Sequence, residues 1–106
     1  MGAAEAYVEE YLEDKATALG WRCYKFTSPG RLAVPDRIVV GNSHTVFVEC
    51  KAPGEKPRAT QVRELRGLAN RGAEVCCIDT REQADALIAY IKGEGPWIGQ
   101  DWRRAR

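Results

Sequence analysis

The sequence predicts a single α/β domain in which a mixed central sheet is flanked by helices. Two observations support this fold class. The spacing of apolar residues switches between helical and strand periods in the order αβββαβα, which is typical of an α/β sandwich. The composition, 44% hydrophobic and 29% charged over 106 residues, is that of an ordinary globular chain with a modest core. We therefore expect one domain over residues 1–93 and a C-terminal tail over residues 94–106.

The first predicted elements are a helix and a strand. Apolar residues recur with a helical period over residues 3–19, and Gly20 is a typical helix end. Residues 21–26 alternate in the manner of a strand. Residues 27–30 contain proline and glycine, so we expect the chain to leave the sheet there as a loop.

The next two strands form a predicted hairpin. Residues 37–40 and 45–48 are short apolar runs, and the Gly41-Asn42-Ser43 segment between them is typical of a turn. We expect the two runs to pair about the midpoint between Asn42 and Ser43. Asp36 then lies directly opposite Glu49, because both are equally far from that midpoint.

The second half of the chain predicts a helix and then a strand. Residues 52–57 contain two prolines and are expected to form a loop. Thr60 is the predicted cap of a helix that runs to about Asn70, with Gly72 as its C-terminal signal. Residues 74–78 then form a fourth strand.

A last helix precedes the tail. The segment Thr80-Arg81-Glu82-Gln83 has the capping-box pattern, and Gly93 is the expected end of the helix. The apolar stripe of this helix consists of Ala84, Leu87, Ile88 and Ile91. In the tail, Trp97 and Trp102 could either cap the core or contact a partner chain or DNA.

The predicted hairpin gathers two acids and an amine. Cross-strand neighbours have Cβ atoms about 5 Å apart, so Asp36 and Glu49 should be adjacent. Glu49 and Lys51 are two residues apart and therefore share one face of their strand. Two carboxylates and a lysine on one face form a site for a hard divalent cation and a water molecule.

These residues carry a resemblance to a known family. Pro35-Asp36 followed by Glu49-x-Lys51 matches the PD-(D/E)xK nuclease signature, and the segments around it resemble the VRR-NUC branch of that superfamily. The resemblance covers about residues 5–79 and includes Ser28-Pro29-Gly30-Arg31 and Gln61. One departure is Ala33, where relatives commonly have glycine. The resemblance implies a restriction-endonuclease-like core and nuclease activity.

The resemblance also implies roles in metal binding. Asp36 and Glu49 would be ligands of Mg²⁺, or of Mn²⁺, together with the backbone carbonyl of Cys50. Lys51 would orient or deprotonate the attacking water and offset negative charge in the transition state. The alternative is that these residues have no catalytic role, with Asp36 as an acid at a turn and Glu49 and Lys51 as an exposed ion pair on a strand.

Two further residues complete the expected catalytic set. Related junction-resolving nucleases have an acid about eleven residues before the glycine that ends the first helix, which identifies Glu9 here. Glu5, Glu10 and Glu13 compete with it. Gln61 matches a glutamine in the helix after the lysine and would hold the attacking water or a phosphate. Each of these could instead be a solvated surface residue.

The charge distribution favours nucleic-acid contacts near the site. The net charge of the chain is only +1, but residues 51–71 carry six basic and two acidic side chains. A solvated helix face would show the same pattern. The candidate contacts to nucleic acid are Lys25, Ser28, Arg31, Arg37, Lys56 and Arg58.

Other features exclude some classes of protein. No apolar run reaches membrane-spanning length, and the acidic N-terminus does not resemble a signal peptide. Four cysteines without a CxxC pair, and one histidine, argue against a zinc site. We expect reduced thiols in a cytoplasmic protein of a bacterial host cell, and the small size suggests a phage or mobile-element origin.

The functional expectation is a metal-dependent, structure-selective DNA endonuclease that acts in DNA repair on branched DNA such as Holliday junctions. Stand-alone relatives resemble junction resolvases, so we also expect a homodimer whose symmetry suits two opposed cuts. Three alternatives stay open. These are a non-catalytic nucleic-acid-binding module on the same fold, an interaction subunit of a replication or repair protein, and an RNA endonuclease.

Overall fold

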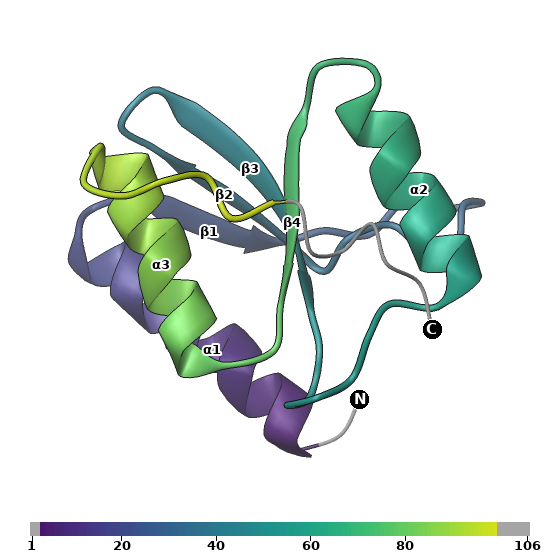
Figure 1. Cartoon of the computed structure of the whole chain (residues 1–106), viewed down its shortest axis with the longest axis horizontal. Helices are drawn as coiled ribbons and strands as arrows, with labels where there is room; N and C mark the ends of the chain where they lie inside the picture. The colour runs from purple at the N-terminus through teal and green to yellow at the C-terminus, as the bar shows by residue number, and fades with distance from the viewer. Residues whose placement is uncertain (1–2, 100–106) are drawn as a thin grey trace.

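The computed structural model describes residues 3–99 and confirms the predicted order αβββαβα. Its elements are α1 (Ala3–Ala18), β1 (Arg22–Lys25), β2 (Arg37–Gly41), β3 (His44–Cys50), α2 (Ala59–Ala69), β4 (Glu74–Ile78) and α3 (Arg81–Lys92). The sheet is mixed and flanked by helices, as expected from the sequence. Figure 1 shows α1 and α3 on one side of β4 and α2 on the other.

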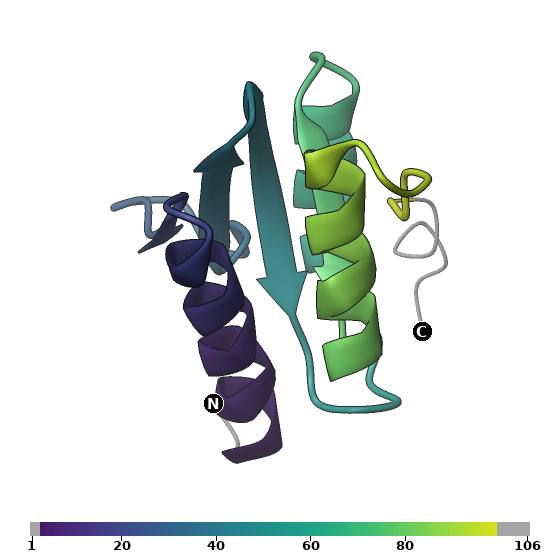
Figure 2. The same ribbon diagram turned by 90° about the vertical axis from the view of Figure 1, so that its left-hand side faces the viewer.

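The strands lie in the order β1-β2-β3-β4. β1 to β3 form an antiparallel meander, whereas β3 and β4 are parallel. The parallel pair follows from the connection between these strands, since α2 carries the chain back to the starting edge of the sheet. Figure 2 looks onto α1 and α3, which lie in front of the sheet with α2 behind it.

Strand alternation divides the core into two clusters. The larger cluster packs between the sheet and the helices α1 and α3, and it includes Val39, Val46, Val48 and Cys76. The smaller cluster packs under α2 and consists of Val62, Leu65 and Val75, with Phe47 and Cys77 partly buried against it. Consecutive residues of β3 and β4 therefore point to opposite clusters, as the period of two requires.

The hairpin pairs in the predicted register. Gly41 lies opposite His44, and the pairing continues to Arg37 opposite Val48. Asn42 and Ser43 have φ values of 46° and 66°, so both residues of the two-residue turn are left-handed. A turn of this hand matches the right-handed twist of the two strands, and asparagine tolerates the left-handed conformation better than most residues.

One expected helix start is corrected and the other is confirmed. The N-cap of α2 is Arg58, not Thr60, because the Oε1 atom of Gln61 accepts a hydrogen bond from the Arg58 backbone N–H at 2.9 Å. Thr80 does cap α3, since its Oγ1 accepts from the Gln83 N–H at 3.1 Å. However, the Gln83 side chain accepts from the N–H of Asp79 and not from that of Thr80, so the capping box is incomplete.

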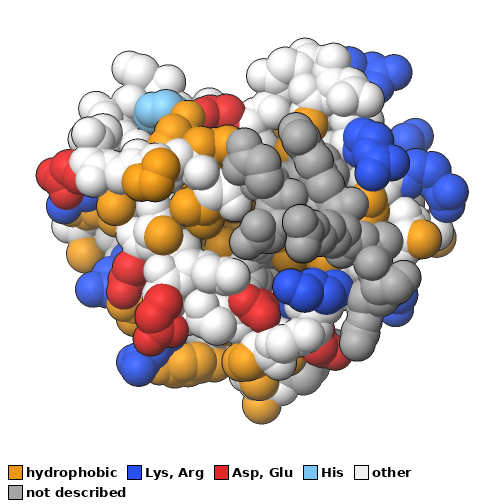
Figure 3. Space-filling view, in the orientation of Figure 1, with side chains coloured by type: hydrophobic (Ala, Val, Ile, Leu, Met, Phe, Trp, Pro, Cys, Tyr) orange, Lys and Arg blue, Asp and Glu red, His pale blue; other side chains and the backbone are white. Residues whose placement is uncertain are grey.

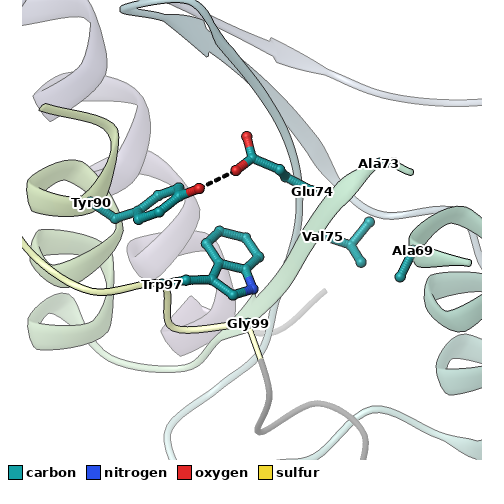
Figure 4. Close-up of a pocket in the computed structure, with 7 residues that line it drawn as sticks. All are labelled: Ala69, Ala73, Glu74, Val75, Tyr90, Trp97 and Gly99. Atoms are coloured by element: carbon teal, nitrogen blue, oxygen red, sulfur yellow. Dashed lines mark hydrogen bonds between the residues drawn. The ribbon is translucent and has the colours of Figure 1, made fainter. Parts of the chain in front are cut away.

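The start of the tail packs on the core. Trp97 and Ile98 contact the larger cluster, and the Trp97 ring lies 4.8 Å from that of Tyr90, measured between centroids. Beside these rings is a cavity of about 320 Å³, where the Tyr90 hydroxyl donates to Glu74 (Figure 4). Trp97 therefore caps the core, whereas Trp102 lies outside the described residues.

The four cysteines are free thiols, as predicted. Burial raises the pKa of Cys23 to about 11 and the pKa of Cys77 to about 12. Cys76 and Cys77 face opposite sides of β4, in agreement with the strand assignment. Within residues 3–99, no helix combines the length and the apolar character needed to cross a membrane.

Two glycine substitutions should have opposite effects on stability. A Cβ atom at Gly41 would lie 2.3 Å from the Trp21 ring, so we expect Gly41→Ala to lower the free energy of unfolding by about 1–3 kcal/mol. At Gly67, inside α2, a Cβ would meet only Arg71 Nη1 at 3.8 Å. Gly67→Ala should therefore raise the free energy of unfolding by up to about 1 kcal/mol.

Urea denaturation of both variants beside the wild-type protein measures these changes. Equal effects of the two substitutions would contradict the packing of Trp21 on the hairpin.

Candidate active site

The C-terminal end of β3 carries an acid and a lysine that are both largely buried. Glu49 is 2% exposed and Lys51 is 9% exposed. The Nζ atom of Lys51 lies 3.4 Å from Glu49 Oε2. The Lys51 backbone N–H donates to the carbonyl of Ile78 at 2.9 Å, so pairing with β4 holds the chain beyond the last residue of the strand.

Asp36 is fixed beside this pair by the hairpin. It precedes β2, and one more step of the observed register places it opposite Glu49. Its Oδ2 atom accepts a hydrogen bond from the Cys50 N–H at 2.8 Å, and its carbonyl accepts from the Phe26 N–H at 2.8 Å. The neighbouring strands therefore hold Asp36 from both sides, in the position that the sequence predicts.

Gln61 connects α2 to the same site. It is 9% exposed, and its Nε2 atom donates to Glu49 Oε2 at 2.9 Å. Its Oε1 atom accepts from the N–H of Arg58 at the start of the helix. The amide thus satisfies the beginning of α2 and orients Glu49 at the same time, which gives Gln61 a clear role in positioning Glu49.

Glu9 extends from α1 toward the other edge of the site. It is 2% exposed, and its Oε1 atom is 2.8 Å from Arg37 Nε and 3.4 Å from Lys25 Nζ. Arg37 also lies 3.4 Å from Glu13. Within the described part of the chain, the buried Oε2 atom of Glu9 has no hydrogen-bond partner.

Glu5 is a second acid of α1 near the site. Burial and the charge of Asp36 raise its pKa, and the charge of Glu5 in turn contributes to raising the pKa of Glu49. The sequence analysis considered Glu5 as the catalytic acid of the first helix but favoured Glu9. Glu5, Glu9 and Glu13 are spaced four residues apart and therefore share one helix face, which could have indicated that Glu5 lies near the site as well.

The pKa values of the two hairpin carboxylates, Asp36 and Glu49, are both raised. Burial raises the pKa of Glu49 to about 8, and the charge of Asp36 adds to this shift, while Lys51 opposes it. Burial and the charge of Glu9 raise the pKa of Asp36, against the hydrogen bond from Cys50 and the charge of Lys51. Positive charge from the protein therefore offsets only part of the effect of burial on these two acids.

The carboxylates fit a cation that keeps part of its hydration. Residues 3–99 contain no group of three or more His, Cys, Asp or Glu side chains arranged to hold a metal ion. However, Asp36 Oδ1 and Glu49 Oε1 accept no hydrogen bond from the described residues, since the bonds given above use the other oxygen of each acid. Mg²⁺ typically binds through one or two carboxylates and retains several waters, so this pair suits it.

Four of the six expected phosphate contacts form two groups. Lys25 and Arg37 lie beside the site but pair with Glu9, with 57% and 11% of their side chains exposed. Lys56 and Arg58 are exposed at the start of α2, without an ion pair among the described residues. Lys56 and Arg58 are therefore more available than Lys25 and Arg37 to contact a phosphate.

The loop between β1 and β2 holds the other two candidates. Ser28 is half-buried, and its carbonyl accepts from the Arg31 N–H at 3.1 Å. The Arg31 guanidinium is 68% exposed and pairs with Glu64 of α2 at 2.9 Å. Ala33 in this loop has a φ of 68°, a conformation that favours glycine.

Comparison with known proteins identifies relatives of the chain. No family model matches the chain. The chain is 43% identical over 86 residues to "Putative nuclease p44" of Acyrthosiphon pisum secondary endosymbiont phage 1, which covers 80% of this chain and 92% of that protein. A solved structure titled "VRR_NUC domain" matches with a TM-score of 0.77 and 32% identity, over 84% of this chain and 98% of the solved chain.

The raised pKa of Glu49 predicts how stability depends on pH. Its folded-state value of about 8 lies above the reference value of 4.5, so the folded protein binds one more proton than the unfolded chain between these pH values. Without divalent metal, stability should fall as pH rises through this window, by up to about 1.4 kcal/mol per pH unit from this group.

Glu49→Gln should reduce that slope and should be more stable than the wild-type protein above pH 8. Denaturation between pH 5 and 9 in the presence of a chelator measures both effects. Glu10→Gln, an exposed site on α1, is the control and should leave the slope unchanged. An unchanged slope in Glu49→Gln would show that Glu49 is not the strained acid.

Proposed function

Since the chain belongs to the VRR-NUC family of nucleases, we propose that it is a metal-dependent, structure-selective DNA endonuclease. The proposed substrate is branched DNA such as a Holliday junction, and the proposed reaction is hydrolysis of a phosphodiester bond. The observation that supports this function best is the half-buried Asp36 beside the buried Glu49 and Lys51, at the end of β3.

The raised pKa values of the carboxylates support a metal cofactor. Asp36 and Glu49 are held with one oxygen each in a protein hydrogen bond, which leaves the other oxygen for a ligand. A bound Mg²⁺ or Mn²⁺ would polarise the scissile phosphate and lower the pKa of a water molecule. Asp36, Glu49 and the Cys50 carbonyl are the proposed ligands.

The other residues of the site would position the reacting groups and offset negative charge. Lys51 would orient the attacking water and stabilise the negative charge that develops on the phosphate. Gln61 fixes the carboxylate of Glu49 through its 2.9 Å hydrogen bond. The acids of α1 would complete the site, with Glu9 as the proposed catalytic acid, and its unpartnered Oε2 atom is suited to accept a proton or a hydrogen bond from the water.

An uncovered apolar surface supports the proposed homodimer. α2 packs against β4, and the same face of the sheet at β1 and β2 carries Tyr24 and Val40, which are 58% and 39% exposed. Leu32, in the adjoining loop, is 91% exposed. A second copy of the chain on this surface would bury these side chains and place two active sites on opposed strands of a junction.

Removal of Lys51 should abolish cleavage without unfolding the protein. We expect Lys51→Ala to lower the rate of metal-dependent cleavage of a labelled four-way junction by at least about 100-fold. Lys92→Ala, an exposed lysine at the end of α3, should cleave at the wild-type rate. The assay compares a junction, a flap, a plain duplex and an RNA of the same sequence, with Mg²⁺ or Mn²⁺ and with a chelator.

Symmetric cuts in the junction, lost in Lys51→Ala and with the chelator, would support a junction-selective endonuclease. Cuts in the flap alone would keep the chemistry and overturn the junction assignment, and cuts in RNA alone would overturn the choice of DNA. Binding without cleavage by the wild-type protein would contradict the enzymatic function and favour a binding module.

The dimer surface is tested by placing a charge on it. Tyr24→Lys should weaken self-association by at least about 10-fold, because a lysine would lose its hydration in the interface. Tyr7→Lys is the control, since Tyr7 is 52% exposed on α1 and lies on the other side of the sheet. Analytical ultracentrifugation over a concentration series measures both. A wild-type protein that stays monomeric at all concentrations would overturn the proposed dimer.

A further inference from the structure

A groove with a positive lining runs beside α2, away from the carboxylates. Its walls are formed by residues of α2, by the residues that follow this helix, and by the loop after β1. The lining residues are Arg31, Arg63, Glu64, Gly67, Leu68 and Arg71, around a volume of about 320 Å³. Three guanidinium groups and one carboxylate give the groove a net charge of +2. Figure 3 shows Lys and Arg side chains gathered on the side of the molecule where α2 lies.

The arginines of the groove keep donors for a ligand. Arg31 is held by Glu64 at 2.9 Å, and Arg71 donates to the Gly67 carbonyl at 2.9 Å through one of its nitrogens. Arg63 is exposed and has no ion pair or hydrogen bond from its side chain within residues 3–99. Because a guanidinium carries five donors, each arginine can still bind an anion in the groove.

Gly67 gives a second, independent indication of a ligand. Glycine inside a helix costs about 1 kcal/mol relative to alanine. Nothing inside the protein requires it here, since a Cβ at this position would meet no protein atom closer than 3.8 Å. Glycine at such a position is typical of a place where another backbone approaches closely, and this Cβ position lies in the wall of the groove.

The groove is connected to the active site by two elements. The loop after β1 begins at Phe26, which donates to the Asp36 carbonyl, and reaches the groove at Arg31. α2 carries Gln61, which binds Glu49, and lines the groove from Arg63 to Leu68, two to seven residues later. Two to seven residues of helix rise about 3 to 10 Å. That range corresponds to about one to three nucleotides along one strand of a duplex.

We propose that this groove binds the phosphate backbone of the DNA arm that flanks the cut, within about three nucleotides of the scissile phosphate. This proposal rests on the proposed nuclease function and assigns a binding surface to it. Arg63, Arg31 and Arg71 would contact successive phosphates, Gly67 would allow the backbone to approach α2, and Leu68 would contact a sugar.

The test uses two variants that change the groove in different ways and one matched control. Arg63→Glu reverses the free charge, and Gly67→Leu fills the groove without changing the charge. Arg66→Glu makes the same charge change on the exposed surface of α2 outside the groove. Binding of a labelled four-way junction with long arms is measured with Mg²⁺ in the Lys51→Ala background, over a series of salt concentrations.

Arg63→Glu and Gly67→Leu should each raise the Kd at least about 10-fold, and Arg66→Glu should raise it less than about 3-fold. Arg63→Glu should also make the dependence of log Kd on log salt shallower by about one unit, whereas Gly67→Leu should leave that slope closer to the parent value. Equal effects of Arg63→Glu and Arg66→Glu, with no effect of Gly67→Leu, would overturn the groove assignment while the parent still binds the junction.

A different result identifies failure of the proposed function itself. If the parent protein binds no DNA and the chain with Lys51 intact cleaves none, the nuclease proposal fails before any groove variant is compared. In that case the groove would have no DNA arm to bind, and the inference that depends on it would also be overturned.

Discussion

The register of the β2–β3 hairpin is the constraint on which the rest of the structure depends. The left-handed turn at Asn42 and Ser43 pairs Gly41 with His44, and every later pair follows from that one. A slip of one residue would turn the core residues of one of the two strands toward α2 and solvent. The same slip would remove Asp36 from Glu49. Core packing therefore selects the register that also assembles the two carboxylates.

The acids of the site differ in how much positive charge lies close to each of them. On the α1 side, Glu9 is neutralised by Arg37 at 2.8 Å and by Lys25 at 3.4 Å. On the hairpin side, the charge of Lys51 lowers the pKa of both Asp36 and Glu49, but burial raises both pKa values. A buried carboxylate is costly unless positive charge offsets it, so the two hairpin acids are less well compensated than Glu9. The divalent cation proposed between Asp36 and Glu49 would supply that compensation.

The sequence predicted the features that depend on local geometry. The distances of Asp36 and Glu49 from the turn were enough to place them opposite each other, because strand pairing is nearly one-dimensional. The start of α2 was predicted two residues late, since the Gln61 amide accepts from Arg58 and replaces the cap expected from Thr60. The pairing of Glu9 with Arg37 could not be read from the sequence. It depends on how α1 packs across β2, which no spacing along the chain encodes.

Three residues with an energetically unfavourable conformation or burial support the proposed position of the substrate. Ala33 has a left-handed φ of 68°, Glu49 is a buried acid with a raised pKa, and Gly67 weakens a helix that would accept alanine. Glu49 lies in the site, Gly67 lines the groove, and Ala33 follows Arg31 of the groove by two residues, whereas the core between the sheet and the helices α1 and α3 is apolar. Natural chains depart from local preference mainly where function requires it. These departures support the proposed path of the DNA arm from Glu49 to the groove beside α2.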